Sequence, residues 1–314
     1  MLILSLPPVH QLDLLRLIIE HPLVGAVRYN TGVPSAYDPY ETVKRIQVLA
    51  EPQGKPFWVD LKAKQLRVVE WAVVPDSPII LNHKVKVELP ARVHLRGDES
   101  CELREVVDGN KLYVDGKASL VGKGQSINIL AKKLEIEGGL LDIDHEYLKA
   151  ALSLGIKRFM LSFVESWADV QELEEAIARH SHGTVSVHEC DIMFKIESQA
   201  GVEFVRELPN TYFTVDSPYS VMAARDDLMV HIGVMDMPEA LQTIATQDPH
   251  AVCASRLLMG LEGGGVSMAD LSDLEYMRRL GYKHFMLSDG ISREHTKEAL
   301  VFWAAYAAQR PFEK

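Results

Sequence analysis

Two short stretches of the chain combine residues suited to a buried strand with charged side chains. Lys195 and Glu197 lie two positions apart at the end of an apolar run, and because strand side chains alternate, both point to one face. Arg225, Asp226 and Asp227 follow a second such run. Carboxylates from neighbouring strand ends, with cations beside them, can hold a hard divalent metal and an anionic substrate. A surface salt-bridge cluster is the alternative for either stretch alone, but together they favour chemistry.

The composition is that of a globular protein with a substantial core. Of the 314 residues 47% are hydrophobic and 25% are charged, and the formal net charge is −11. With no long basic run, nucleic acid is excluded as a partner, and an anionic substrate must be held by locally placed cations or metal. No run approaches the ~18 apolar residues of a membrane span, and the N-terminus lacks the basic region of a signal peptide. We therefore expect a cytoplasmic protein that does not bind membranes.

The cysteines give no sign of a disulfide scaffold or a structural zinc site. Cys101, Cys190 and Cys253 lie far apart in the sequence and form no closely spaced pair. Both kinds of site use cysteines at characteristic short or repeated spacings.

Short apolar runs alternate with amphipathic segments through most of the chain, which predicts a parallel α/β fold. We expect eight parallel strands, three before an insertion and five after it, and therefore a (β/α)8 TIM barrel made of residues 1–67 and 140–314. The expected strands are 2–6, 24–30, 57–62, 158–164, 192–197, 221–224, 252–255 and 285–288. The expected helices include 11–20, 38–50, 144–154, 167–180 and 292–308, with others beginning near Pro238 and Ser267.

Residues 68–139 break this alternation. They show strand-like alternation, as in 84–89, and turn signals at 108–110, 115–116 and 122–124. No helical periodicity is present in this stretch. We predict a small, separate all-β domain, resembling a β-barrel, that is inserted after the third strand and hinged as a lid over the strand ends.

Charged or hydroxyl side chains follow nearly every predicted strand. A TIM barrel places its catalytic residues at the carboxyl ends of its strands. Arg, Lys, Asp and Glu are seldom fully buried unless paired, so this pattern favours a functional site over a structural pairing network. In chain order these residues are Arg28, Asn30, Asp60, Lys62, Arg67, Ser162, Lys195, Glu197, Arg225, Asp227, Ser255, Arg256, Ser288 and Asp289.

In their order, these strand-end residues resemble the pyruvate kinase family. The resemblance covers essentially the whole chain, and the β insertion falls where that family has its B domain. The family's C-terminal domain, which binds effectors, has no counterpart, so we expect no control by a sugar phosphate. The matching motifs are Arg28-x-Asn30, Asp60-x-Lys62 with Arg67, Ser162-Phe163-Val164, Lys195-Ile196-Glu197, Ala224-Arg225-x-Asp227-Leu228, Ala254-Ser255 and Met286-Leu287-Ser288.

The resemblance implies a metal and phosphoryl centre. Glu197 and Asp227 would bind Mg²⁺ or Mn²⁺, chelated in turn by a pyruvate-like enolate and carboxylate. Lys195 would neutralise the transferred phosphoryl group, which is a task of positioning and electrostatics. Arg28 and Arg67 would clamp phosphate oxygens.

The resemblance also implies a binding site for the substrate carboxylate. Ser255 stands where the family has Thr and keeps a hydroxyl that can bind the carboxylate or relay a proton. The backbone amides of Asp226 and Asp227 would hold the same carboxylate. Asp226 replaces a family glycine and adds negative charge beside that group.

A potassium site is only partly preserved in the resemblance. Asn30, Asp60 and the Leu61 carbonyl match the family's ligands, but Gly32 stands where the family has a serine ligand. Val33 replaces a histidine on the nucleotide side.

Two functions follow from this set of residues. The leading one is a Mg²⁺-dependent phosphotransferase acting on phosphoenolpyruvate, pyruvate or a related small carboxylic acid, with ADP or ATP if a nucleotide is used. The alternative is a metal-dependent C–C lyase or aldolase acting through a pyruvate-type enolate. Retention of Arg28, Arg67 and Lys195 favours phosphoryl transfer, whereas the lost histidine and glycines favour the lyase. A catalytically inactive binding protein is disfavoured while Lys195, Glu197 and Asp227 coexist.

Any homo-oligomer would form through barrel helices.

We expect K⁺ to stimulate the reaction weakly or not at all, because Gly32 supplies no side-chain oxygen where the family has a hydroxyl ligand. Initial rates in K⁺ and in a non-binding organic cation at equal ionic strength measure this. A large stimulation by K⁺ would show that the remaining ligands suffice.

Overall fold

The computed structural model describes residues 1–96, 99–209, 211–214 and 216–310. The chain divides into two compact units. One consists of Met1–Leu61 and Asp142–Lys314, and the other of Lys62–Leu141. Each unit is built around its own hydrophobic core.

The first unit is a closed barrel of eight parallel strands, which confirms the predicted TIM barrel. Around the barrel the strands follow the order β1-β17-β16-β15-β14-β13-β3-β2. Their bounds are β1 Leu2–Ser5, β2 Val24–Asn30, β3 Phe57–Leu61, β13 Arg158–Leu161, β14 Asp191–Ile196, β15 Tyr219–Ala224, β16 Val252–Ala254 and β17 His284–Met286.

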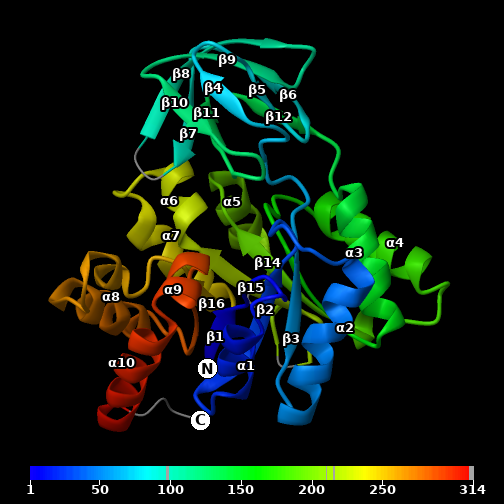
Figure 1. The fold of residues 1–314 in the computed structure, drawn as a ribbon, viewed down its shortest axis with the longest axis vertical. Helices are drawn as coiled ribbons and strands as arrows, with labels where there is room; N and C mark the ends of the chain where they lie inside the picture. Colours follow the sequence, from blue (N-terminus) through cyan, green and yellow to red (C-terminus); the bar gives the residue numbers. More distant parts are fainter. Residues whose placement is uncertain (97–98, 210, 215, 311–314) are drawn as a thin grey trace. The chain divides into compact units, whose positions relative to one another are not determined.

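Helices surround this barrel (Figure 1). They are α1 Leu12–Glu20, α2 Pro39–Ala50, α3 Asp142–Ser153, α4 Trp167–His180, α5 Gln199–Glu207, α6 Arg225–Ile232, α7 Met237–Gln247, α8 Met268–Arg279, α9 Asp289–Glu294 and α10 Thr296–Gln309. Short 3₁₀ turns occupy Glu51–Gln53, Val187–Glu189 and Met259–Gly263. Within the described part of the chain, no helix has the length and apolar character needed to cross a membrane.

Helices α5 and α6 were not predicted, and α9 and α10 were expected as one helix. Helix α5 carries Gly201 in its first turn, which weakens a helical pattern. A Cβ at Gly201 would lie 2.8 Å from the Val164 carbonyl oxygen, so close packing requires glycine here. Helix α6 begins directly after β15 with three charged residues and has little apolar periodicity. The expected single helix over 292–308 is interrupted at His295, which has a non-helical backbone.

Apolar side chains fill the interior of the barrel. Each strand contributes to one buried cluster rich in methionine, and Trp58 is its only aromatic member. The members are Ile3, Ala26, Trp58, Met160, Met193, Met222, Ala224, Val252, Ala254 and Met286. Because this interior is a packed core, the polar residues that follow it gather at the carboxyl ends of the strands.

All regular secondary structure among the described residues of the second unit is β-strand. A five-stranded antiparallel sheet has the order β11-β7-β8-β9-β5, and two pairs, β10-β4 and β12-β6, complete the unit. Alternating inward residues such as Val93, Leu103 and Leu112 form its core. The strands are β4 Ala72–Val74, β5 Ile79–Ile80, β6 Lys84–Val87, β7 Ala91–Arg96, β8 Glu99–Val107, β9 Lys111–Asp115, β10 Ser119–Val121, β11 Asn128–Ala131 and β12 Leu134–Glu137.

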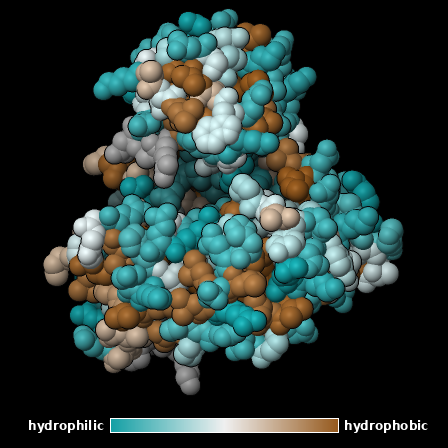
Figure 2. All heavy atoms as spheres, viewed as in Figure 1, coloured by the Kyte–Doolittle hydropathy of each residue, from teal (hydrophilic) through white to brown (hydrophobic). Residues whose placement is uncertain are grey.

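The surface of the barrel unit mixes hydrophobic and hydrophilic residues. Figure 2 shows hydrophobic residues interspersed with hydrophilic ones over this unit. Exposed apolar side chains on its helices include Val48 on α2 and Val301 on α10. Scattered exposed hydrophobic residues are normal for a soluble protein, so oligomerisation through the barrel helices stays a prediction.

The start of α8 offers a test of local stability. Ser267 Oγ accepts a hydrogen bond from the Asp270 N–H, and the Asp270 carboxylate accepts one from the Ser267 N–H at 2.7 Å. We expect Ser267→Ala to lower the free energy of unfolding by about 1 kcal/mol, as for other lost helix caps. Urea unfolding followed by circular dichroism measures this. Ser272→Ala, at an exposed position inside the same helix, is the control and should not destabilise the protein, since Ala is the better helix former.

Candidate active site

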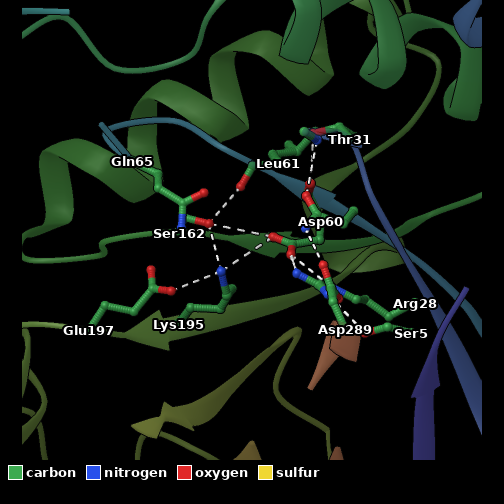
Figure 3. Close-up of polar contacts among 12 residues, drawn as sticks. Ser5, Arg28, Thr31, Asp60, Leu61, Gln65, Ser162, Lys195, Glu197 and Asp289 are labelled. Atoms are coloured by element: carbon green, nitrogen blue, oxygen red, sulfur yellow. Dashed lines mark hydrogen bonds and ion pairs between the residues drawn. The ribbon is translucent and has the colours of Figure 1, made fainter. Parts of the chain in front are cut away.

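The Lys195 ammonium lies at the centre of a buried polar network (Figure 3). Its Nζ donates a hydrogen bond of 2.8 Å to Ser162 Oγ and lies 2.9 Å from Glu197 Oε1 and 3.5 Å from Asp60 Oδ1. Burial alone would lower the pKa of Lys195, but the charges of Asp60 and Glu197 outweigh it and hold the pKa above its ordinary value. The ammonium is therefore a fixed positive charge. This pKa direction disfavours a neutral Schiff-base lysine.

Glu197 is held from two sides just beyond the end of β14. One carboxylate oxygen pairs with Lys195, and the other accepts a hydrogen bond of 2.7 Å from the Phe163 N–H. Phe163 has a left-handed backbone, with φ of 51°. This conformation costs free energy for a residue other than glycine, so the backbone is strained at this turn. Burial raises the pKa of Glu197 to about 7, and the charge of Asp227 also raises it, against the opposing effect of Lys195. A buried carboxyl of this kind would be stabilised in its charged form by a further cation.

Arg28, on β2, meets two carboxylates. Its Nε donates a hydrogen bond of 2.8 Å to Asp60 Oδ2, and one Nη pairs with the same oxygen. The other Nη donates to Ser5 Oγ at 2.8 Å and pairs with Asp289. Asn30 Nδ2 donates to the second oxygen of Asp289 at 2.8 Å. Residues from β1, β2, β3 and α9 are thereby joined at the carboxyl ends of neighbouring strands (Figure 3).

Ser255 and the start of α6 form a second part of the site. Ser255 Oγ accepts a hydrogen bond of 3.0 Å from the Asp226 N–H and donates one of 2.7 Å to the Ala254 carbonyl. Arg225 donates to the Ser255 carbonyl at 2.7 Å and forms a two-pronged pair with Asp273 on α8 at 2.7 and 2.9 Å. Arg225 thus fixes the start of α6 against β16 and α8.

The carboxylate of Asp226 lies in the same region. The side chain is half exposed, but desolvation by the surrounding protein raises its pKa, and the charge of Arg256 opposes that effect. Arg256 Nη1 lies 3.5 Å from Asp226 Oδ1.

Arg67 and Lys62 belong to the inserted unit. Within it the Arg67 guanidinium donates to Gln65 Oε1 at 2.7 Å and to the Gly124 carbonyl at 2.7 Å. The predicted role of Arg67 as a phosphate clamp remains a prediction.

The two predicted metal ligands, Glu197 and Asp227, are carboxylates, and they do not form a complete set of protein ligands. In the described ranges no group of three or more His, Cys, Asp and Glu side chains could hold a metal ion. Glu197 and Asp227 interact electrostatically. A pair of carboxylates suits Mg²⁺, which usually keeps several water or substrate ligands.

The predicted potassium ligands have other partners in the protein. Asn30 Oδ1 accepts a hydrogen bond of 3.0 Å from the Gly32 N–H. The carboxylate of Asp60 is engaged by Arg28 and Lys195. Cationic side chains of the protein thus already supply positive charge to Asp60.

Some residues of this network had no predicted role. Ser5 is the last residue of β1, and that position was the signal that could have identified it, whereas Asp289, at the start of α9, was already among the residues that follow the predicted strands but had no role or partner assigned. Asp273 lies inside α8, and nothing in the sequence pattern marks it as the partner of Arg225.

The comparisons with known proteins agree with this fold. The family model described as the barrel domain of pyruvate kinase matches residues 86–261, more than half of the chain. The chain therefore belongs to the pyruvate kinase family.

Individual relatives are distant. A pyruvate kinase of Methanocaldococcus jannaschii is 26% identical over 182 residues, which are 57% of this chain and 37% of that protein. A pyruvate kinase of Mycobacterium intracellulare is 27% identical over 261 residues, which are 82% of this chain and 48% of that protein. The chain thus spans less than half the length of each. The crystal structure of pyruvate kinase from Pyrobaculum aerophilum shares the fold, with a TM-score of 0.73 at 18% identity over 99% of this chain and 73% of that one.

We expect a divalent metal to bind more tightly as the pH rises. Glu197 must lose its proton to become a ligand, and burial raises its pKa to about 7. The ionised fraction therefore increases between about pH 6 and about pH 8, and Mn²⁺ affinity should rise by roughly tenfold if one proton is released. Titration with Mn²⁺, followed by electron paramagnetic resonance at constant ionic strength, measures this affinity.

The control is Glu197→Gln, which keeps the shape of the side chain but cannot ionise. It should bind Mn²⁺ weakly at every pH and lose turnover, with an unchanged circular dichroism spectrum. Normal turnover in this variant would place the metal site elsewhere.

Proposed function

We propose that the protein is a Mg²⁺-dependent phosphotransferase of the pyruvate kinase type. Its substrate would be phosphoenolpyruvate, pyruvate or a related small carboxylic acid, with ADP or ATP as the nucleotide. The observation that carries the proposal is the buried Lys195 ammonium, held charged between Asp60 and Glu197. A fixed cation of this kind suits a reaction in which negative charge moves between two oxygens.

The side chains at the end of β14 and the start of α6 fit a divalent metal. Glu197 and Asp227 supply the oxygen ligands that Mg²⁺ and Mn²⁺ prefer, and the raised pKa of Glu197 reflects a buried negative charge that lacks full compensation. A metal bound there would neutralise the charge of an enolate and its carboxylate.

Lys195 would act on the phosphoryl group. Its Nζ is oriented by Ser162 Oγ and Glu197 Oε1 before any ligand arrives. Preorganised charge of this kind needs no rearrangement during the reaction. The ammonium would hold the phosphoryl oxygens while the bond to the donor oxygen breaks and the bond to the acceptor oxygen forms.

Ser255 would act at the carboxylate end of the substrate. Its hydroxyl is fixed by the Asp226 N–H and the Ala254 carbonyl, and its left-handed backbone, with φ of 60°, turns the strand end toward α6. From this position it would bind the carboxylate or relay a proton to the enolate carbon. The backbone amides at the start of α6 would assist, since helix N-termini favour anions.

Arg28 and Arg67 would clamp the phosphoryl oxygens. Arg28 lies in the barrel network, and Arg67 enters the proposal through the family motif. The inserted unit would serve as the lid that carries Arg67. A nucleotide partner likewise rests on membership of the family.

A metal-dependent lyase or aldolase is the second candidate. The observation that favours it is the state of Arg28, whose guanidinium already contacts Asp60, Ser5 and Asp289. An enolate enzyme needs the metal and Ser255 but has little need of a phosphate clamp. The two functions therefore differ in their dependence on Lys195 and the arginines.

We expect Lys195→Met to lower phosphoryl transfer by about 10²- to 10³-fold, the scale seen when one preorganised electrostatic donor is removed. Metal-assisted proton exchange on pyruvate should fall less, because Glu197, Asp227 and Ser255 remain. ATP formation from phosphoenolpyruvate and ADP with Mg²⁺ measures the first reaction, and loss of deuterium from labelled pyruvate measures the second.

Two further variants complete this experiment. Lys149→Met removes an exposed lysine from α3 and should leave both rates unchanged. Arg67→Ala should weaken phosphoryl transfer if the inserted unit supplies a clamp. Unimpaired turnover in both Lys195→Met and Arg67→Ala would remove the phosphotransferase from consideration in favour of the lyase.

A further inference from the structure

The hydrogen-bond donors of Arg28 are largely occupied by the protein itself. A guanidinium carries five N–H groups. Two contacts go to Asp60 Oδ2, one goes to Ser5 Oγ and one goes to Asp289 Oδ1. These contacts account for four of the five donors. In this arrangement Arg28 cannot present a two-pronged grip to a phosphoryl group.

The two carboxylates on Arg28 are not equivalent. The Asp60 side chain is fully buried, whereas that of Asp289 is 32% exposed. Asp60 also pairs with Lys195 at 3.5 Å, so it belongs to the fixed frame of the barrel. Asp289 begins the short helix α9 and lies on the solvent-accessible side of Arg28. An incoming anion would therefore replace Asp289 and leave Asp60 in place.

Asp289 is held firmly in its charged form. Its second oxygen accepts a hydrogen bond of 2.8 Å from Asn30 Nδ2, and Arg293 Nη2 lies 3.5 Å away. Burial would raise the pKa of Asp289, but the charges of Arg28 and Arg293 outweigh it and hold the pKa well below its usual range. At neutral pH this side chain is a carboxylate that already has four polar partners, Arg28, Asn30, Arg293 and Ser5.

We propose that Asp289 is a specificity-determining residue that occupies, on Arg28, the place of a substrate oxyanion. A phosphoryl group can form hydrogen bonds with Arg28 only if it displaces this carboxylate. The inference deepens the proposed function and rests on it, because it takes Arg28 to be the residue that meets the phosphoryl group.

Because an anion must displace Asp289 from Arg28, some anions should bind there more readily than others. A phosphate dianion that arrives alone must displace the charged Asp289 from Arg28, while Asp60 and Glu197 already offset the positive charges of Arg28 and Lys195, and like charges at short range oppose binding. A phosphoryl group that arrives with a divalent cation brings its own compensating charge. Asp289 therefore discriminates against free phosphate and in favour of metal-bound phosphoryl groups.

A purely structural role for Asp289 predicts the opposite effect of its removal. If Asp289 only orients Arg28, a neutral residue there leaves the guanidinium misplaced, and phosphate binds less tightly. If Asp289 competes for Arg28, a neutral residue frees the guanidinium, and phosphate binds more tightly. The sign of the change in affinity separates the two roles.

The experiment is a calorimetric titration of the intact protein with inorganic phosphate, without divalent metal and at constant ionic strength. We expect Asp289→Asn to bind phosphate about 10- to 100-fold more tightly than the unmodified protein, the range for loss of a competing charge-assisted hydrogen bond. Asp289→Glu keeps the charge and should bind as weakly as the unmodified protein. Glu294→Gln removes an exposed carboxylate from the same helix and should change the affinity less than twofold.

A double variant tests whether the gain passes through Arg28. Adding Arg28→Met to Asp289→Asn should abolish the tighter binding. Persistence of the gain in the double variant, or unchanged or weaker binding in Asp289→Asn, would overturn the proposal. Circular dichroism checks that each variant is folded, and Asp289→Ser replaces Asp289→Asn in the titration if the latter does not fold.

A second titration with Mg²⁺ present tests the discrimination itself. The unmodified protein should bind phosphate much more tightly with Mg²⁺ than without it, and Asp289→Asn should show a smaller difference. An equal difference in both proteins would count against the proposal. Neither titration requires turnover, so a failed phosphotransferase assay and a failed phosphate titration give separate answers.

Discussion

The carboxylate of Asp60 joins the two cations around which the site is arranged. It is fully buried on β3, and one oxygen pairs with Arg28 while the other lies 3.5 Å from the Lys195 ammonium. Two buried cations so close together would repel each other without an anion between them. Ser162 also contacts both Lys195 and the Leu61 carbonyl beside Asp60. The carboxylate on β3 therefore helps the charges on β2 and β14 to coexist.

The cations of the network leave the carboxylate of Glu197 incompletely compensated. Glu197 and Asp289 add their negative charges to that of Asp60, and Lys195, Arg28 and Arg293 oppose them. The raised pKa of Glu197 is the result, with burial as its main cause. A divalent metal near Glu197 would restore the balance, which connects the electrostatics of the barrel with the proposed metal-dependent chemistry.

The features that this chain shares with the pyruvate kinase family and those in which it differs have different physical causes. The motifs that resemble those of the pyruvate kinase family follow the barrel strands, where the side chains are fixed rigidly. The differences that the resemblance implies lie beyond the strands, at Gly32 in a turn and at Asp226 in the first turn of α6. Turns tolerate change in the backbone more readily than strands do. Substrate and cation preferences can therefore differ from those of the relatives while the central charges are retained.

The sequence by itself determined the barrel, the β insertion and most of the charged side chains at the strand ends. Alternating apolar runs define buried strands, and cap residues such as Ser267 define helix starts, because both depend on neighbours in sequence. The short helices α5 and α6 escaped prediction, since packing rather than local pattern stabilises such segments. Only the tertiary structure decided the partners of Arg28. Asp289 is 261 positions away in sequence, and it reaches Arg28 because barrel closure sets β1 between β17 and β2.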